Sequence, residues 1–128
     1  MARQGLPVFV YPFSYVPAAA RATSFGASHG SEITYVFDTL PDHPITYGPR
    51  TIPAATPDDL KLSEAMHAYW VAFAKTSDPD SAGGPRWPRF AMGAERLIEF
   101  GADGVNIRTD FAKPRLDLIE ASRKPPAS

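Results

Sequence analysis

Residues 7–15 read PVFVYPFSY, the most strand-like stretch of the chain. β-Branched and aromatic side chains follow one another without a polar face. This pattern is typical of a strand that lies inside a sheet covered by helices. Proline has no backbone N–H, so Pro12 removes one donor from the ladder, and we expect the pairing to end or bend there. The stretch therefore predicts an α/β protein with a buried strand over Pro7–Tyr15.

A long helix is the second clear element of the sequence. Thr56 offers a side-chain oxygen for an N-cap, Pro57 suits the first helical position, and two aspartates follow in the first turn. Apolar residues then recur at helical spacing, at Leu62, Met66, Tyr69 and Phe73. The pattern stops at the sequence TSDP, which ends with Pro79. We predict a helix over residues 57–76.

Shorter elements surround this helix. Residues 33–37, ITYVF, fit either a strand or a short helix, because so short an apolar run does not separate the two. Residues 41–57 hold five of the 14 prolines and predict a long surface loop. Residues 96–100 and 105–108 flank a Gly-Ala-Asp-Gly turn and predict a β-hairpin. Residues 116–119 suit a short terminal helix.

Length and composition exclude several classes of protein. The 128 residues suit one domain, which we place over residues 1–122, with 123–128 as a disordered tail. Thirteen Lys and Arg against 14 Asp and Glu predict neither a nucleic-acid surface nor a membrane partner. The chain has no cysteine, which excludes a disulfide framework and a thiolate site. Residues 1–7 lack the apolar run of a signal peptide, so we expect a cytoplasmic chain.

Three histidines are the main candidates for chemistry. His43 lies in a proline-rich turn and His67 lies beside the apolar stripe of the predicted helix, so we expect both to face solvent. His29 stands in the small-residue loop GASHGS, residues 26–31, which leaves its imidazole accessible. An accessible imidazole can act as a general base. Neither a second histidine nor a cysteine stands at a ligand spacing, so we predict no metal and no cofactor.

A nucleophile is harder to find. Residues 26–30 fit the bare pattern Gly-x-Ser-x-Gly of a nucleophile elbow, with Ser28 at its centre. An elbow needs a strand before it and a helix after it, and the side chains of the neighbours Ser28 and His29 diverge. The geometry therefore disfavours Ser28 as the nucleophile that His29 would activate.

Four segments, taken in order, resemble a known family. Residues 26–37, GASHGSEITYVF, resemble the histidine segment of the type-B carboxylesterases, the cholinesterase-like branch of the α/β-hydrolases. Residues 62–79 resemble the helix that follows in that family, Trp87-Pro88 resembles the tryptophan–proline pair after it, and Pro7–Tyr15 is similar to the preceding strand. The resemblance implies the C-terminal portion of an α/β-hydrolase fold, with a few strands, one long helix and shorter helices.

The resemblance also implies roles for two residues. His29 corresponds to the triad histidine, which takes the proton of the nucleophilic serine and returns it to the leaving alcohol. Glu32 matches a carboxylate that lies near the active site in the family. The family's serine elbow, oxyanion-hole glycines and triad acid all precede the histidine, so the resemblance covers about the last quarter of a usual member. It implies a small-molecule carboxylic ester as substrate.

Three functions stay open at this point. The chain is a segment that supplies the general base His29, or a minimal esterase that pairs His29 with Ser28, Ser31 or a partner's serine and with Glu32 or Asp38. The third function is that of a non-catalytic oligomerisation or binding module. A strand cut from a larger sheet exposes backbone groups and apolar surface. We therefore expect a homo-oligomer or a complementing chain along Pro7–Tyr15.

Overall fold

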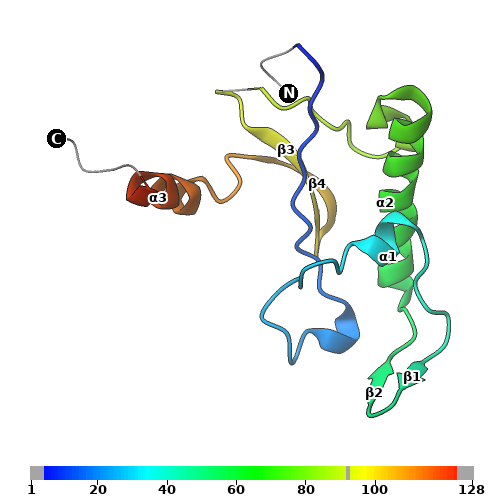
Figure 1. Cartoon of the computed structure of the whole chain (residues 1–128). Helices are drawn as coiled ribbons and strands as arrows, with labels where there is room; N and C mark the ends of the chain where they lie inside the picture. The colour runs from blue at the N-terminus through cyan, green and yellow to red at the C-terminus, as the bar shows by residue number, and fades with distance from the viewer. Residues whose placement is uncertain (1–4, 92, 124–128) are drawn as a thin grey trace.

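The computed structural model describes residues 5–91 and 93–123, and Figure 1 shows the arrangement of their elements. In chain order these are η2 (Ala18–Ala20), α1 (Ile33–Val36), β1 (Ile45–Tyr47), β2 (Arg50–Ile52), α2 (Pro57–Thr76), η3 (Pro79–Ala82), β3 (Arg96–Gly101), β4 (Gly104–Thr109) and α3 (Lys113–Arg123). The hairpin β3–β4 lies at the centre, with α2 on one side of it and the extended N-terminal segment beside it. Helix α3 projects away from the other elements.

Helix α2 has the bounds that the sequence predicts. The Thr56 hydroxyl accepts a hydrogen bond from the backbone N–H of Asp59 at 3.3 Å, and the Asp59 carboxylate accepts one from the Thr56 N–H at 2.8 Å. This reciprocal capping box satisfies two donors that a helix start otherwise leaves unpaired. At the other end, Ser77 adopts a left-handed conformation, and its backbone N–H donates a hydrogen bond to the Phe73 carbonyl. In the described ranges no helix combines the length and the apolar character that a membrane crossing needs.

The predicted β-hairpin is confirmed. Strands β3 and β4 are antiparallel, with a register that runs from Arg96 opposite Thr109 to Gly101 opposite Gly104. Gly104 has a φ of 89°, which favours glycine at the turn. On β3 the buried Glu99 accepts hydrogen bonds from the Ser14 hydroxyl at 2.6 Å and from Arg108 Nε at 2.5 Å. These bonds tie the N-terminal segment to both strands.

The predicted strand over Pro7–Tyr15 forms only in part. It lies parallel to β3, and Phe13 and Phe100 form a single bridge. The Pro12 carbonyl accepts from the Phe100 N–H at 3.1 Å, and the Ser14 N–H donates to the Phe100 carbonyl at 2.9 Å. The pairing therefore continues past Pro12, so the first of our two alternatives, that it ends there, is wrong, and the second, a bend there, stays a prediction.

Pro12 nevertheless limits the ladder. A parallel ladder would require its missing N–H to donate to the carbonyl of Ile98, so the bridge before Phe13 cannot form. The side chains of residues 8–13 are half-buried rather than buried, since α2 covers only one side of the segment. The prediction of burial on both faces is therefore wrong for the chain as it folds here.

Three shorter elements refine or correct the sequence predictions. Residues 33–36 form a short helix, so the helix rather than the strand is the correct one of the two alternatives left open by the sequence. The predicted loop over 41–57 is wrong for residues 45–52, where β1 and β2 pair around a turn at Gly48. Its prolines flank the paired residues rather than interrupt them. Helix α3 is longer than the predicted 116–119, and it includes Arg123, which the sequence prediction assigns to the tail. Residues 124–128 lie outside the described residues.

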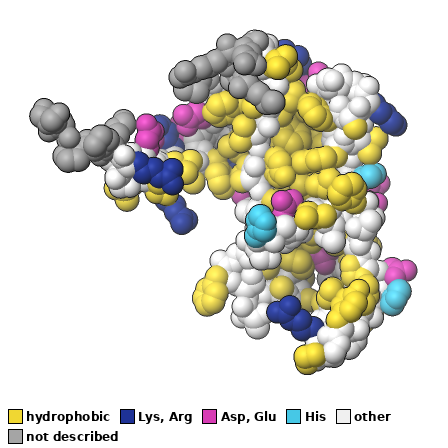
Figure 2. Space-filling model, viewed as in Figure 1, with side chains coloured by type: hydrophobic (Ala, Val, Ile, Leu, Met, Phe, Trp, Pro, Cys, Tyr) yellow, Lys and Arg dark blue, Asp and Glu magenta, His cyan; other side chains and the backbone are white. Residues whose placement is uncertain are grey.

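Aromatic side chains dominate the core. Phe100 is 0% exposed, and its ring centroid lies 5.8 Å from those of Tyr69 and Trp87 and 6.0 Å from those of Tyr11 and Trp70. Edge-to-face pairs at such distances add to the free energy gained by burial. Figure 2 shows apolar side chains gathered over the N-terminal segment and the hairpin. The cluster joins α2, the hairpin and the N-terminal segment into one unit.

Truncating Phe100 tests this core. Phe100→Ala is expected to lower the free energy of unfolding by about 3–5 kcal/mol, because it removes a fully buried ring from four aromatic neighbours. Urea unfolding followed by tryptophan fluorescence measures the change. Phe25→Ala removes the same atoms from a fully exposed ring and is the matched control, expected within about 0.5 kcal/mol of wild type. Equal losses in the two variants would contradict this account of the core.

Candidate active site

The loop that carries His29 is a tight turn closed on one carbonyl. The Ser28 carbonyl accepts from the Ser31 N–H at 3.1 Å and from the Ser31 hydroxyl at 2.8 Å. Gly30 adopts a φ of 77°, a conformation that residues with a Cβ rarely take. The turn leaves the His29 side chain exposed at its tip and directs the Ser31 hydroxyl back to the backbone.

An open cavity of about 290 Å³ lies beside this turn. Its lining residues are Tyr11, Phe13, Ala27, Ser28, His29, Gly30 and Glu32. Sequence reasoning missed Tyr11, which it treated only as a strand residue. Burial raises the pKa of Tyr11, and the nearby charge of Glu32 raises it further. The cavity therefore brings together His29, Glu32 and a neutral phenol.

The structure does not assemble a serine–histidine–carboxylate triad from the described residues. Within these ranges the His29 imidazole makes no hydrogen bond to Ser28, Ser31 or Glu32. Asp38 is turned toward α2 instead, where it accepts a 2.6 Å hydrogen bond from the Ser63 hydroxyl. This contact argues against Asp38 as the carboxylate of a newly assembled site. The described residues also hold no cluster of three or more metal-ligating side chains.

The start of the His29 loop is anchored on α2 by Tyr15 and Asp59. The Tyr15 hydroxyl donates to Asp59 Oδ1 at 2.6 Å, and both side chains are buried, at 2% and 4% exposed. Burial and the Asp59 carboxylate raise the pKa of Tyr15 to about 12. Burial alone would raise the pKa of Asp59, but the hydrogen bonds from Tyr15 and Thr56 hold that pKa below its ordinary value. A neutral phenol and an ionised carboxylate thus form the first anchor.

The end of the loop is anchored on the same helix through α1. The Val36 carbonyl accepts a hydrogen bond from His67 Nδ1 at 2.8 Å. His67 is half-buried, so our expectation that it faces solvent is wrong. The apolar stripe of α2 gave no sign that α1 would cover the neighbouring face of the helix. The loop between residues 16 and 32 is therefore attached to α2 at both ends, which leaves His29 free in between.

Comparison with known proteins places these features in a family context. A model of the carboxylesterase family matches residues 1–119. The fumonisin B1 esterase of Sphingopyxis macrogoltabida is 35% identical over 75% of the chain, and carboxylesterase 3 of Homo sapiens is 37% identical over 74%. A solved carboxylesterase of Geobacillus stearothermophilus has a TM-score of 0.66 and 27% identity, over 91% of this chain and 22% of its own. The chain spans only 17% of the length of either sequence relative.

Replacing Tyr15 tests the first anchor. Tyr15→Phe is expected to cost about 1.5–3 kcal/mol of unfolding free energy at neutral pH, because a buried carboxylate loses a donor. The bond's contribution is present above the ordinary Asp pKa of about 4 and is lost as pH falls below it. It is also present below the ordinary Tyr pKa of about 10 and is lost as pH rises toward 12. Urea unfolding measured across pH is therefore expected to show that the free energy of unfolding falls less in the variant than in the wild type, both below about pH 4 and above about pH 10.

The exposed Tyr47 provides the matched control. Tyr47→Phe deletes the same hydroxyl from a side chain that is 65% exposed, and it is expected to leave stability and its pH dependence unchanged. A pH profile of Tyr15→Phe that overlays the wild-type profile would refute the anchor.

Proposed function

The chain belongs to the carboxylesterase family, and we propose that it is the segment of a carboxylic ester hydrolase that supplies the general base, His29. The family and the α/β-hydrolase fold agree with the resemblance drawn from the sequence. One observation carries the proposal: the His29 imidazole lies in an open cavity, without a partner among the described residues, on a loop held at both ends. Such a base can accept a proton from a group brought into the cavity.

The proposed reaction is hydrolysis of a small-molecule carboxylic ester through a serine. The serine oxygen attacks the ester carbonyl carbon while His29 takes the hydroxyl proton. The bond to the alcohol oxygen then breaks, and His29 returns the proton to the departing alcohol. Water repeats the two steps on the acyl-serine, releasing the acid and restoring the serine. The reaction consumes one water and yields one acid and one alcohol.

Glu32 assists this base in our proposal. It is half-buried and lines the same cavity as His29, without a hydrogen bond to it in the described structure. A nearby carboxylate stabilises the imidazolium that forms when His29 holds the serine proton. We assign Glu32 this electrostatic role, whereas the nucleophile comes from residues other than Ser31, whose hydroxyl is bound to the Ser28 carbonyl.

The free edge of the Pro7–Tyr15 segment indicates where the serine would come from. One edge pairs with β3, while the backbone groups of Phe9, Tyr11 and Phe13 have no backbone partner within the described ranges. Tyr11 and Phe13 also line the His29 cavity, so a strand added at this edge would end beside it. We infer that a complementing polypeptide or a second copy pairs there. Light scattering is expected to give a mass above that of the monomer, and a monodisperse monomer across a wide concentration range would contradict the pairing.

Substitution of His29 tests the catalytic proposal. The chain is purified under native conditions, with any subunit that stays bound, and is assayed with p-nitrophenyl butyrate and a fluorophosphonate label. His29→Gln is expected to lower kcat/KM at least about 100-fold, because the proton acceptor is lost. His43→Gln changes an exposed histidine outside the cavity and is expected to stay within about twofold of wild type.

Two outcomes would oppose the proposal. Full activity in His29→Gln would show that His29 is not the general base. The absence of both labelling and hydrolysis in the native preparation would instead support the non-catalytic binding module.

A further inference from the structure

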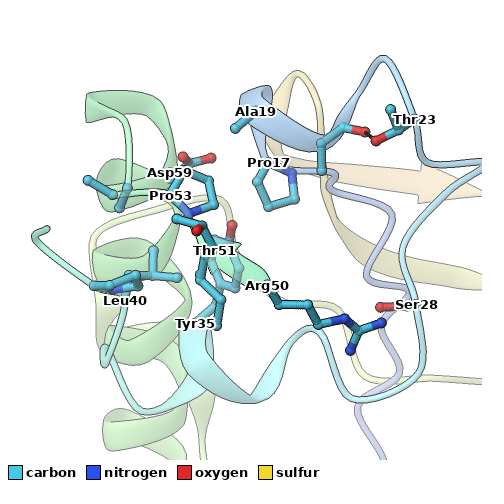
Figure 3. A pocket seen from close by; sticks show the side chains of 15 residues that line it. Pro17, Ala19, Thr23, Ser28, Tyr35, Leu40, Arg50, Thr51, Pro53 and Asp59 are labelled. Carbon is cyan, nitrogen blue, oxygen red and sulfur yellow. Dashed lines mark hydrogen bonds between the residues drawn. The ribbon is translucent and has the colours of Figure 1, made fainter. Parts of the chain in front are cut away.

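A second and larger cavity lies next to the His29 loop. Its volume is about 750 Å³, within the usual range for pockets that hold small organic ligands. It opens between the segment that contains η2 and the β1–β2 hairpin, and Ser28 lines both this cavity and the one that holds His29. Figure 2 shows the molecule hollowed in this region, with Lys or Arg side-chain atoms at the edge of the hollow. Figure 3 shows its lining side chains.

The floor of the cavity contains an unsatisfied hydroxyl. Tyr35 is 2% exposed, and its hydroxyl is the only buried side-chain polar atom in the described residues without a hydrogen-bond partner. Buried polar groups in folded proteins nearly always find a partner, so such an exception calls for an explanation. Burial and the neighbouring Asp59 charge raise the pKa of Tyr35, so the hydroxyl remains protonated and able to donate. A ligand with a hydrogen-bond acceptor would satisfy it.

The mouth of the cavity carries a cation. Arg50 of β2 is exposed and pairs with no carboxylate in the described part of the chain. Figure 3 shows its side chain extending along the cavity on the side of Ser28, away from Asp59. The Asp59 carboxylate is already saturated by Tyr15 and Thr56 and keeps its negative charge at the opposite end. Charge complementarity therefore favours an anionic group near Arg50 and a neutral group near Tyr35.

The walls between these two ends are mostly apolar, with Thr23 and Thr51 as polar exceptions. Their apolar part consists of prolines, alanines and two branched aliphatic residues, namely Pro17, Ala19, Ala20, Leu40, Pro41, Ile52, Pro53, Ala54 and Ala55. Such walls bind an apolar body and offer it few competing polar groups. A guanidinium matches the two oxygens of a carboxylate.

We propose that this cavity binds a small organic carboxylate, with its charge on Arg50, its apolar body against the proline-rich walls, and a neutral acceptor at the Tyr35 hydroxyl. The site does not use His29 or Glu32, so its test is independent of the test of the catalytic proposal. The carboxylate belongs to a free small acid in this proposal, rather than to an Asp or Glu side chain of another polypeptide segment.

Binding of matched probes to the full chain tests the site. 4-(4-Acetylphenyl)butanoate carries the carboxylate, the apolar body and the acceptor, and backbone amide shifts of Thr51, Ala54 and Ala55 report its binding by NMR. The corresponding butanamide, which lacks the charge, is expected to bind about fivefold more weakly, the effect of one partly exposed ion pair. 4-Phenylbutanoate, which lacks the acceptor, is also expected to bind about fivefold more weakly.

Two variants assign these preferences to residues. Arg50→Gln is expected to abolish the preference for the acid over its amide, and Tyr35→Phe to abolish the preference for the acetylated probe. Tyr35→Phe removes an unpartnered hydroxyl, so it is expected to fold. Arg115→Gln makes the same charge change on exposed α3, outside the cavity, and is expected to bind all probes as wild type does.

The site would be overturned by any of three results. These are equal binding of the acid and its amide to the wild-type chain, an acid preference that survives in Arg50→Gln, and shifts confined to residues outside the cavity. N-Acetylglutamate N-methylamide represents a polypeptide carboxylate. Its tighter binding than 4-(4-acetylphenyl)butanoate would assign the cavity to a protein segment and contradict the proposal.

Discussion

The hydrogen bond between Tyr15 and Asp59 links the N-terminal segment, from which the His29 loop leaves, to the start of helix α2. Asp59 closes the capping box at the start of α2. The same carboxylate accepts a hydrogen bond from the hydroxyl of Tyr15, the last residue of the N-terminal segment. One buried anion therefore fixes the start of a helix and the point where the His29 loop leaves the sheet. Because α1 attaches the other end of that loop to α2 through His67, the long helix supports the site without contributing a catalytic group.

Local signals in the sequence predicted much of this framework. The cap, the proline at the first position and the apolar spacing of α2 act within a few residues of one another, and the helix has the predicted bounds. The glycines around His29 likewise identified an accessible loop. Contacts between distant segments were not predictable in this way. Nothing near His67 in the sequence indicates that its imidazole will donate a hydrogen bond to the Val36 carbonyl. Likewise, nothing near Tyr15 indicates that its hydroxyl will bond to Asp59, 44 residues away.

The same limit explains what sequence reasoning missed around the site. Arg50 and Tyr35 lie 15 positions apart on separate short elements, and only the fold places both in one cavity. The prolines of residues 41–57 predicted a surface loop, whereas two of them, Pro41 and Pro53, form part of the wall of that cavity, and others lie next to the strands of a hairpin. Proline fixes its own φ angle and cannot donate to a strand ladder, so it fits a surface loop and also the positions next to the paired residues of a hairpin.

The chain thus presents an accessible histidine on a loop anchored at both ends, and a segment with an unpaired backbone edge beside it. The central claim is that His29 acts on a serine delivered to this edge. A crystal structure of the native protein with a fluorophosphonate bound to its reactive serine tests that claim most directly. The account predicts the His29 imidazole nitrogen within about 3 Å of the modified serine oxygen or of the oxygen that leaves it. A modified serine whose base is a different residue, with His29 remote from it, would contradict the account.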